Sequence, residues 1–451
     1  MEALTSMVTQ ASDFLWNVIL IILLCGTGIM FTIRLKFIQV RKLKEGFKLV
    51  FESMGKKNEG GKKGEMTAFQ SVATAIAAQV GTGNLTGAAT ALIGGGPGAI
   101  FWMWVSAFFG MSTIYAEATM AQKYKKTVDG EITGGPVYYI RAAFMGKFGK
   151  ILAGLFAIFI VVALGFTGNM VQANSIGAAF TEVFEARGVQ VSPLIFGIIL
   201  ASIAAFIFLG GTQRLASVVE KLVPFMAAVY ILGSLLLILL NITELPGAIK
   251  MIFVGAFKPE AVMGAGAGIA VREAIRYGVA RGLFSNEAGM GSTPHAHARA
   301  KVENPHKQGL AAMVSVFIDT FVILNLTVFS ILTTGAMETH KTGTALTQAA
   351  FSRTFGGFGD IFVAVCLLFF AFSTILGWHF FGLVNMKYLF GDKAGKLYSV
   401  LVIAFVVIGS MLKVDFVWSL SDFFNGLMVI PNAIALWALG GVVVSICKKY
   451  S

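Results

Sequence analysis

Residues 66–87 read MTAFQSVATAIAAQVGTGNLTG, and residues 282–292 read GLFSNEAGMGS. Both stretches lie within apolar segments, and both contain closely spaced glycines beside polar residues. Each glycine weakens a helix by about 1 kcal/mol relative to alanine. In a bilayer, the backbone groups that such a break frees need partners, so a break is tolerated where it lines a polar cavity. The two stretches therefore predict interrupted membrane helices.

The two interruptions also resemble each other, because Val80–Asn84 aligns with Ala288–Ser292. They lie five apolar segments apart, so the second unit would enter the membrane in the inverted orientation. Glycine-interrupted segments at corresponding positions of two halves indicate the binding site of a secondary transporter. Glycines that serve only close helix packing are the simpler alternative, but they do not require the neighbouring Asn84, Asn286 and Glu287.

The composition agrees with a membrane protein. Of 451 residues, 56% are hydrophobic and 13% are charged, and the mean hydropathy is +0.79. Soluble domains have about a quarter charged residues and disordered chains are polar, so both classes are excluded. We expect an all-α polytopic fold with eleven membrane helices, counted as one pre-span and spans 1 to 10. They are residues 14–33, 66–94, 98–121, 151–180, 192–210, 215–240, 264–297, 308–335, 358–386, 397–412 and 417–447.

The positions of lysine and arginine predict the orientation of these spans, because cytoplasmic loops are enriched in both residues. The loops on one side carry 26 of the 35 Lys and Arg residues, ten of them in residues 34–63, and those on the other side carry six. We therefore expect the N-terminus outside, the C-terminus in the cytoplasm, and a multi-pass protein of the cell membrane. This topology explains the basic loop better than nucleic-acid binding does, and no nucleic-acid partner is expected.

Two motifs resemble a known family. Residues 94–110, GGGPGAIFWMWVSAFFG, and residues 282–292 are similar to signatures of the alanine/glycine:cation symporter family. The resemblance implies the leucine-transporter (LeuT) fold, with inverted five-helix repeats at 66–241 and 242–451. Residues 1–65 would add an extra N-terminal helix and a basic loop. It also implies sodium-coupled uptake of alanine or glycine by a chain that functions as a monomer in the lipid bilayer.

The resemblance implies two sites for the co-transported sodium ion. One lies between the span 1 break and a hydroxyl pair on span 8, and its oxygens come from Ala77, Val80, Ser373 and Thr374. The other lies beside the substrate, where Asn84 and Ser285 match the ligand positions. Span 8 hydroxyls also have an ordinary interpretation, because Ser and Thr often bond to carbonyls of their own helix.

The substrate site must hold a carboxylate, an ammonium group and one methyl group. The backbone N–H groups of Gly83 and Asn84 are candidates for the carboxylate, because a half-helix begins there with its positive dipole end. Gln79 and Asn286 can supply side-chain hydrogen bonds. The resemblance places bulky side chains of spans 6 and 8 around the substrate side chain: Phe284, Met290 and Trp378. Phe166, Thr167 and Asn169 of span 3 would close the remaining wall.

Charged residues within the spans are costly and usually functional. Asp319 is a candidate sodium ligand or cavity-lining residue, with a structural hydrogen-bond anchor as the alternative. We expect Glu117 to pair with a base. Glu287 either polarises the site or caps the inner half-helix. Arg272, Arg276 and Arg281 form an outer vestibule or, as we prefer, pair with Glu273, Asp360 or loop carbonyls.

The expected function is therefore sodium-coupled import of small neutral amino acids by alternating access. The nearest alternative is a proton-coupled transporter of the same fold, with Glu287 or Asp319 as the proton carrier. A channel would need a repeated filter motif, and an intramembrane enzyme would need a nucleophile–base pair or a metal set. The sequence contains neither pattern, so we do not expect an enzyme.

Overall fold

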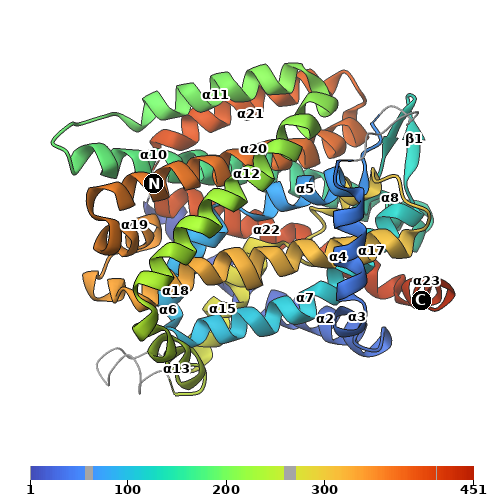
Figure 1. Cartoon of the computed structure of the whole chain (residues 1–451). Helices are drawn as coiled ribbons and strands as arrows, with labels where there is room; N and C mark the ends of the chain where they lie inside the picture. The colour runs from blue at the N-terminus through green and yellow to red at the C-terminus, as the bar shows by residue number, and fades with distance from the viewer. Residues whose placement is uncertain (1, 56–63, 259–270, 413, 451) are drawn as a thin grey trace.

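The computed structural model describes residues 2–55, 64–258, 271–412 and 414–450. Four lysines of the basic loop, Lys56, Lys57, Lys62 and Lys63, lie outside the described residues, and so does the start of the expected span 264–297. Long helices run side by side through the molecule (Figure 1). At one end of this bundle lie α13 (Leu245–Gly255) and α19 (Gly343–Phe355). At the other end lie the short hairpin and the C-terminal helix α23 (Gly440–Tyr450).

The first half of the chain is helical apart from one hairpin. Its elements are α1 (Glu2–Phe14), η1 (Leu15–Leu20), α2 (Ile21–Arg34), α3 (Ile38–Arg41), α4 (Leu43–Ser53), α5 (Ala68–Gln79), η2 (Gly83–Gly87), α6 (Ala88–Gly95), α7 (Gly98–Lys123), β1 (Lys126–Val128), β2 (Glu131–Thr133), α8 (Pro136–Ala143), α9 (Gly146–Ile160), η3 (Val161–Gly168), α10 (Asn169–Glu185), α11 (Pro193–Leu209) and α12 (Gly211–Leu240). The two strands are antiparallel, with Thr127 opposite Ile132.

All the named elements in the described residues of the second half are helices. Besides α13, α19 and α23, its elements are η4 (Ile242–Glu244), α15 (Val271–Asn286), α16 (Pro294–Ala298), α17 (Pro305–Val316), η5 (Phe317–Leu324), α18 (Asn325–Thr333), η6 (Ala336–Thr339), η7 (Gly356–Phe358), α20 (Gly359–Phe390), α21 (Ala394–Met411) and α22 (Val414–Ala438). Several helices continue directly into the next, so that α9, η3 and α10 form one rod, as do α17, η5 and α18.

Seven of the described helices are long and apolar enough to cross a membrane. They are Gly98–Lys123, Gly146–Glu185, Gly211–Leu240, Pro305–Thr333, Gly343–Phe390, Ala394–Met411 and Phe416–Ala438. Ile21–Arg34 and Pro193–Leu209 are apolar but shorter. The polytopic all-α class expected from the sequence is therefore confirmed. The two interrupted segments fall outside the seven because each is divided into short pieces.

The first interruption lies between α5 and η2. A capping box starts α5: Thr67 accepts the Gln70 backbone N–H, and the Gln70 side chain accepts that of Thr67, which satisfies two free donors. The helix ends at Gln79 because Val80 adopts a non-helical backbone, with ψ of 90°. Helical structure resumes at Gly83. The break therefore begins one residue before the expected Gly81, and Asn84 already lies in the following helical turn.

The second interruption lies between α15 and α16. Here α15 continues through Asn286, so Phe284 is still helical and the break begins after Asn286. Three residues of the break have positive φ: Glu287 at 55°, Gly289 at 86° and Gly291 at 82°. Glycine adopts this backbone region freely, whereas a residue with a Cβ is strained there. The glycines therefore end the helix, and Glu287 is held in its conformation by the surrounding structure.

Gly81 is confined by the neighbouring helix α20. A Cβ at Gly81 would lie 2.4 Å from Thr374 Oγ1 and 3.2 Å from Gln172 Oε1. A Cβ at Gly87, on the same interrupted span, would have the Thr82 carbonyl oxygen as its nearest neighbour, at 4.0 Å. An alanine at position 81 would therefore clash with its neighbours, whereas an alanine at position 87 would not, so Gly87 is a matched control for Gly81.

We predict that Gly81→Ala lowers the stability of the purified protein by about 1–3 kcal/mol, the usual cost of overpacking. Gly87→Ala should be neutral or slightly stabilising, because alanine is the better helix former. Thermal unfolding of both variants in detergent measures the difference. Equal stability of the two variants would contradict the close contact between the span 1 break and α20.

Candidate functional site

The first group of polar atoms joins the span 1 break to α20. Ser373 Oγ lies 3.1 Å from the Ala77 carbonyl oxygen. Thr374 Oγ1 lies 3.0 Å from the same oxygen and 3.5 Å from the Val80 carbonyl oxygen. Both hydroxyls also lie within hydrogen-bond distance of the Phe370 carbonyl of their own helix. All four expected residues of this group are therefore together, and their oxygens face one another across two elements.

The second group centres on Asp319 in η5. Its carboxylate accepts hydrogen bonds from Asn84 Nδ2 at 2.7 Å and from Ser285 Oγ at 3.0 Å. Thr320 Oγ1 also donates to it, at 3.0 Å. Asn84 Oδ1 in turn accepts the backbone N–H of Gly81 at 3.0 Å. One carboxylate thus connects the interrupted span 1 and the end of α15 to η5.

Asp319 is completely buried, and all three of its side-chain partners are neutral. No Lys or Arg of the described chain forms an ion pair with it. An isolated buried carboxylate is strongly unfavourable unless a cation or a proton compensates its charge. Asp319 lies between the two interrupted spans, so a cation or a proton bound there would contact both of them.

Gln79 and Asn286 lie across from each other, where the two breaks meet. Gln79 Nε2 donates to the Asn286 backbone carbonyl at 2.6 Å. Gln79 Oε1 is buried and has no donor among the described residues. The Asn286 side chain donates to Thr320 at 3.2 Å and accepts the Ala288 backbone N–H at 3.1 Å. Since buried polar atoms are nearly always hydrogen-bonded, Gln79 Oε1 is an acceptor available to a ligand.

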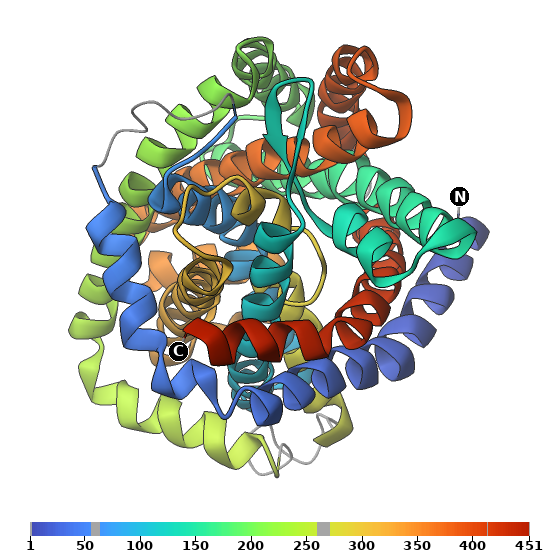
Figure 2. The same cartoon turned by 90° about the vertical axis from the view of Figure 1, so that its right-hand side faces the viewer.

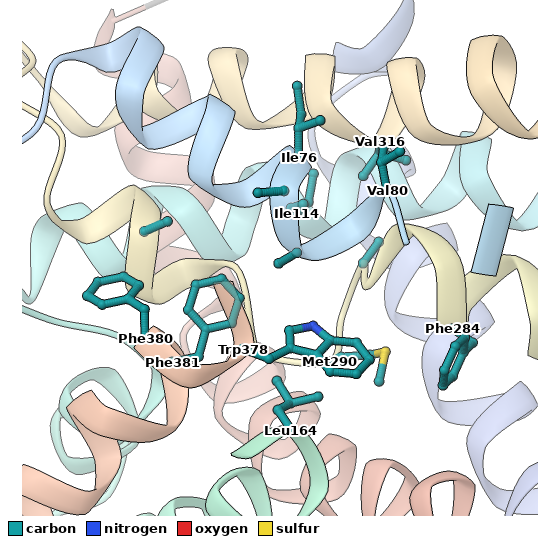
Figure 3. Close-up of a cluster of buried hydrophobic side chains, with 14 of the residues drawn as sticks. Ile76, Val80, Ile114, Leu164, Phe284, Met290, Val316, Trp378, Phe380 and Phe381 are labelled. Atoms are coloured by element: carbon teal, nitrogen blue, oxygen red, sulfur yellow. The ribbon is translucent and has the colours of Figure 1, made fainter. Parts of the chain in front are cut away.

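An apolar wall adjoins these polar groups. Figure 3 shows Trp378 and Met290 close together, with Phe284 farther along the same cluster. The rings of Phe284 and Trp378 are 6.4 Å apart and nearly perpendicular. Trp378 Nε1 donates to Glu287 Oε1 at 2.5 Å, and Ser292 donates to the other oxygen of that carboxylate. All these side chains are at most 4% exposed, so the apolar wall is closed to solvent in this conformation.

The structure does not bring Phe166 and Thr167 into this wall. The Phe166 ring stacks on Phe405 of α21 at 4.7 Å, and the Thr167 hydroxyl donates to carbonyls of its own helix. The residue of this span that contacts Trp378 is Gly168, where a Cβ would lie 2.5 Å from the indole ring. The π-helical turns of η3 change the rotation of the helix, which linear spacing could not predict.

Glu117 was expected to pair with a base, and this expectation is wrong. Its carboxylate accepts the backbone N–H groups of Gly289 and Gly291, at 3.0 and 2.9 Å. Asn432 Nδ2 donates to the same carboxylate at 2.7 Å and to the Gly289 carbonyl at 2.9 Å. Glu117 therefore supplies acceptors for the donors that the span 6 break frees.

Sequence reasoning also missed Asn432, Thr320 and Gln172 as partners of the two breaks. Gln172 accepts the Thr82 backbone N–H at 3.3 Å and donates to the Thr82 hydroxyl at 3.1 Å. An amide side chain inside an apolar span is a signal that could have identified Asn432 and Gln172 before the structure was known. Thr320 gives no such signal, because threonine is common in membrane helices.

Two of the three arginines of α15, Arg276 and Arg281, form ion pairs. Arg276 pairs with Glu273, as expected, at 3.1 Å and with Asp13 at 2.8 Å. Arg281 pairs with Asp422 at 2.7 Å, and its guanidinium lies over the ring of Trp418. A cavity of about 40 Å³ remains between these groups and α1. The preferred pairing role is thus confirmed for Arg276, whereas Asp422 was not foreseen.

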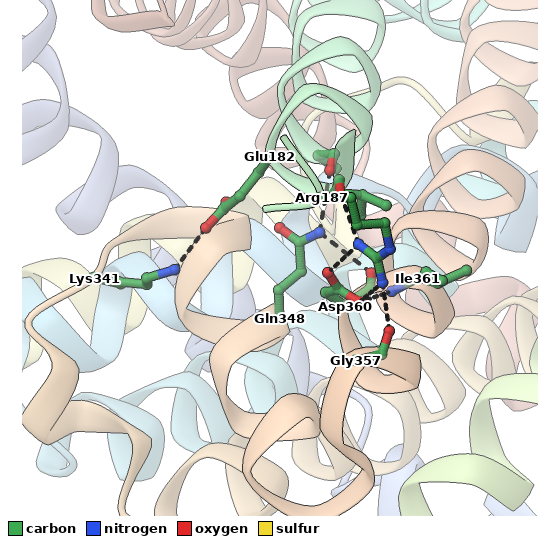
Figure 4. A network of polar contacts seen from close by, with 9 residues as sticks. Glu182, Arg187, Lys341, Gln348, Gly357, Asp360 and Ile361 are labelled. Carbon is green, nitrogen blue, oxygen red and sulfur yellow. Dashed lines mark hydrogen bonds and ion pairs between the residues drawn. The ribbon is translucent and has the colours of Figure 1, made fainter. Parts of the chain in front are cut away.

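The same end of the bundle is tied together by a second polar network (Figure 4). Arg187, just after α10, pairs with Asp360 of α20 at 2.9 Å, so Asp360 does not pair with the α15 arginines. Glu182 pairs with Lys341 at 2.7 Å. Gln348 of α19 donates to the carbonyl oxygens of Ala179 and Asp360. These contacts hold α10, α19 and α20 against one another.

The opposite end has its own ion pairs. Glu131 of the hairpin pairs with the buried Arg299 at 2.9 Å and lies 3.9 Å from Lys387. Burial opposes ionisation of Glu131, but Arg299 and Lys387 outweigh it, so the pKa of the carboxyl lies below its ordinary value. A cavity of about 440 Å³ lies beside this pair, lined by residues of the hairpin, α8 and α20. Both ends of the interrupted segments are therefore covered by charged contacts.

Comparison with known proteins agrees with this architecture. The chain is 41% identical to the sodium/alanine symporter AgcS of Methanococcus maripaludis, over 99% of this chain and 97% of the relative. It is 40% identical to the probable sodium/glutamine symporter GlnT of Bacillus subtilis, over 100% of this chain and 91% of the relative. The crystal structure of MhsT in complex with L-phenylalanine covers 86% of this chain and 99% of its own, with a TM-score of 0.59 at 15% identity.

The structural likeness shows the fold, which is that of the leucine-transporter type. The sequence likeness extends over the whole chain: residues 1–451 match the sodium:alanine symporter family. The resemblance noted from the two glycine-rich motifs is thereby confirmed, as is the expectation of a transporter in place of an enzyme. The chain belongs to the sodium:alanine symporter family, whose members are multi-pass membrane transporters.

Proposed function

We propose that this chain imports small neutral amino acids, alanine and glycine above all, by sodium-coupled alternating access. The observation that carries the proposal is Asp319, a buried carboxylate without a cationic side chain, hydrogen-bonded to both interrupted spans. A cation bound beside it would fix the relative position of the two breaks. Occupation of the ion site would then determine whether the substrate site is formed.

Sodium coordination needs several oxygen ligands, and the chain supplies two such groups. The first consists of the carbonyls of Ala77 and Val80 with the hydroxyls of Ser373 and Thr374. The second consists of the Asp319 carboxylate and the Ser285 hydroxyl. Asn84 now donates to Asp319 from Nδ2 and accepts from Gly81 at Oδ1, so it would turn its oxygen toward the ion on binding. The first group has no carboxylate, so we propose that neutral oxygens alone hold a sodium ion there. The second group adds a negative charge beside the substrate.

For the amino acid, we assign the ammonium group to the free Gln79 Oε1 and to carbonyls at the breaks. The carboxylate would be held at the start of η2 by backbone N–H groups of Gly83 and Asn84, where the helix dipole is positive. Phe284, Met290 and Trp378 would enclose the side chain. Phe166 and Thr167 take no part in this assignment, because they contact α21 and their own helix.

The relatives do not decide the size of the substrate, since one is named for alanine and another for glutamine. Tight enclosure of Met290 and Trp378, which are 1% and 2% exposed, favours the smaller substrate. A pocket that opens between these side chains would have room for a methyl group and would reject longer side chains by steric conflict. We therefore propose alanine and glycine.

We also propose that the shorter helices and the two interrupted segments cross the membrane, which gives eleven spans. The repeats would be residues 66–241 and 242–451, preceded by an extra helix and a basic loop in residues 1–65. The chain would function as a monomer with its N-terminus outside. The excess of lysine and arginine at the hairpin end of the bundle supports this orientation.

Coupling is tested by uptake of labelled alanine into proteoliposomes under an inward gradient of sodium, potassium or protons. We predict uptake with sodium alone. Ser373→Ala/Thr374→Ala removes two ligands without touching the proposed substrate contacts, so it should raise the half-saturating sodium concentration at least about ten-fold, the equivalent of 1.4 kcal/mol. Gly87→Ala serves as a control on the same break.

Unchanged sodium dependence in a well-folded double variant would overturn the assignment of the first ion site. The runner-up function, proton coupling through Asp319 or Glu287, predicts uptake driven by a proton gradient without sodium. Asp319→Asn keeps the shape of the side chain but removes its charge and its titration. Uptake by this variant that stays sodium-dependent and insensitive to pH would argue against proton coupling.

The substrate-size assignment predicts that wild type binds alanine and glycine but not leucine. Met290→Ala should admit valine or leucine and should lose some alanine affinity through the cavity that it leaves. Each added methylene is worth about 1–3 kcal/mol in an apolar pocket, so the gain is measurable by calorimetry in sodium. If the variant folds and still excludes valine, the size filter lies elsewhere.

The orientation is tested by labelling single cysteines in a cysteine-free background. Lys150→Cys and Thr342→Cys are suitable because both side chains are exposed. Lys150 lies near the start of α9, which follows α8 at the hairpin end of the bundle, and Thr342 directly precedes α19 at the other end. We predict that an impermeant thiol reagent labels intact cells at position 342 and fails at position 150. The reverse pattern would overturn the orientation.

A further inference from the structure

A basic cavity lies apart from the transport site, where the end of α2 meets the C-terminal helix. Figure 2 shows α23 running beside the α2–α4 corner on the hairpin side of the bundle. The cavity has a volume of about 160 Å³, several times the roughly 30 Å³ that one water occupies in the liquid. Its lining residues are Arg34, Leu35, Lys36, Arg41, Val444, Cys447 and Lys448. Four of the seven are cationic.

Backbone hydrogen bonds position one arginine of the cavity, and the other packs close to Gly440. Arg41 donates from Nε to the Lys36 carbonyl at 2.6 Å and from Nη2 to the Leu35 carbonyl at 3.0 Å. A guanidinium has five N–H donors, so three remain available to a ligand. Arg34 lies over the corner between α22 and α23, where a Cβ at Gly440 would come within 2.6 Å of its Nη1. The cavity is therefore lined by oriented cations.

These cations have no acidic partners in the described chain. None of Arg34, Lys36, Arg41 and Lys448 takes part in an ion pair there. The nearest carboxylate along the chain, Glu45, is already paired with Lys42 at 2.9 Å. The larger cavity beside the hairpin differs, because two of its basic residues are paired, Arg299 with Glu131 and Lys387 with Asp392. Four mutually repelling charges around one cavity favour an anionic ligand.

Exposed apolar side chains adjoin the cavity. Ile33, Phe37 and Val40 are 63%, 50% and 65% exposed. They flank the basic residues at the point where the apolar helix α2 ends. A ligand with a negative headgroup and hydrocarbon chains would contact both surfaces at once, whereas a soluble anion would contact only the basic one.

From these contacts we infer that this corner binds the headgroup of an anionic phospholipid. The phosphodiester lies between Arg34, Arg41 and Lys448, and the acyl chains lie along α2 beside Ile33. Basic cavities between membrane helices near the cytoplasmic surface suit such headgroups, and the cytoplasmic leaflet is rich in anionic lipid. The bound lipid joins the first membrane helix to α23, two parts of the chain outside the interrupted segments.

The test is native mass spectrometry of the detergent-purified full chain, titrated with phosphatidylglycerol and, separately, with phosphatidylcholine. Each Lys or Arg near an anionic headgroup strengthens binding roughly five-fold. We expect Arg34→Gln/Lys36→Gln/Lys448→Gln to weaken phosphatidylglycerol binding about 100-fold. The control Lys147→Gln/Lys150→Gln/Lys396→Gln removes the same charge from exposed positions outside the cavity and should bind as wild type does.

If both triple variants lose affinity for phosphatidylglycerol equally, binding follows net charge. If neither loses affinity, the lipid binds elsewhere. Either result overturns the inference. Lys448→Glu alone, a mild change near the chain end, should weaken binding about 25-fold and covers the case in which the triple variant fails to fold. Addition of inorganic phosphate tests whether the cavity binds a lipid headgroup or a soluble phosphate. Displacement of the lipid by millimolar phosphate would identify a soluble phosphate ligand and overturn the lipid assignment.

Discussion

The structure depends on one constraint: backbone groups that leave a helix inside a membrane must find partners within the protein. The two interrupted segments meet this constraint with buried polar side chains. Glu117 and Asn432 bind the backbone at Gly289 and Gly291. Asn84 and Gln172 bind the N–H groups of Gly81 and Thr82. The irregular backbone is thus held in one arrangement by these side chains.

The same constraint explains why two spans are connected so directly to their neighbours. Span 1 contacts α20 through hydroxyl–carbonyl pairs and contacts η5 through Asn84 and Asp319. Span 6 contacts α20 through Glu287 and Trp378. A shift of either break would change both sets of contacts. An ion that binds these oxygens therefore acts on the geometry of the whole site, which is the physical basis that we propose for coupling.

Much of the fold could be predicted from the sequence. Hydropathy and the two glycine-rich motifs predict the all-α class, the family and the positions of the breaks to within a few residues. Pairing of Ser373 with Ala77 was also foreseen, because the resemblance aligns these positions. The orientation of Phe166 was not, since π-helical turns rotate η3 away from regular helical spacing. The role of Glu117 was not foreseen either. The sequence does not reveal that its carboxylate accepts hydrogen bonds from the backbone N–H groups of Gly289 and Gly291.

The central claim is that sodium organises the two breaks and the amino acid follows. It is tested most directly by the thermal stability of the purified protein in sodium or potassium chloride, with and without alanine, in the absence of any gradient. A ligand at 100 times its Kd stabilises a protein by about 2.7 kcal/mol. The account predicts stabilisation by sodium, none by potassium, and a further increase with alanine in sodium only. Equal stabilisation by alanine in potassium would contradict it.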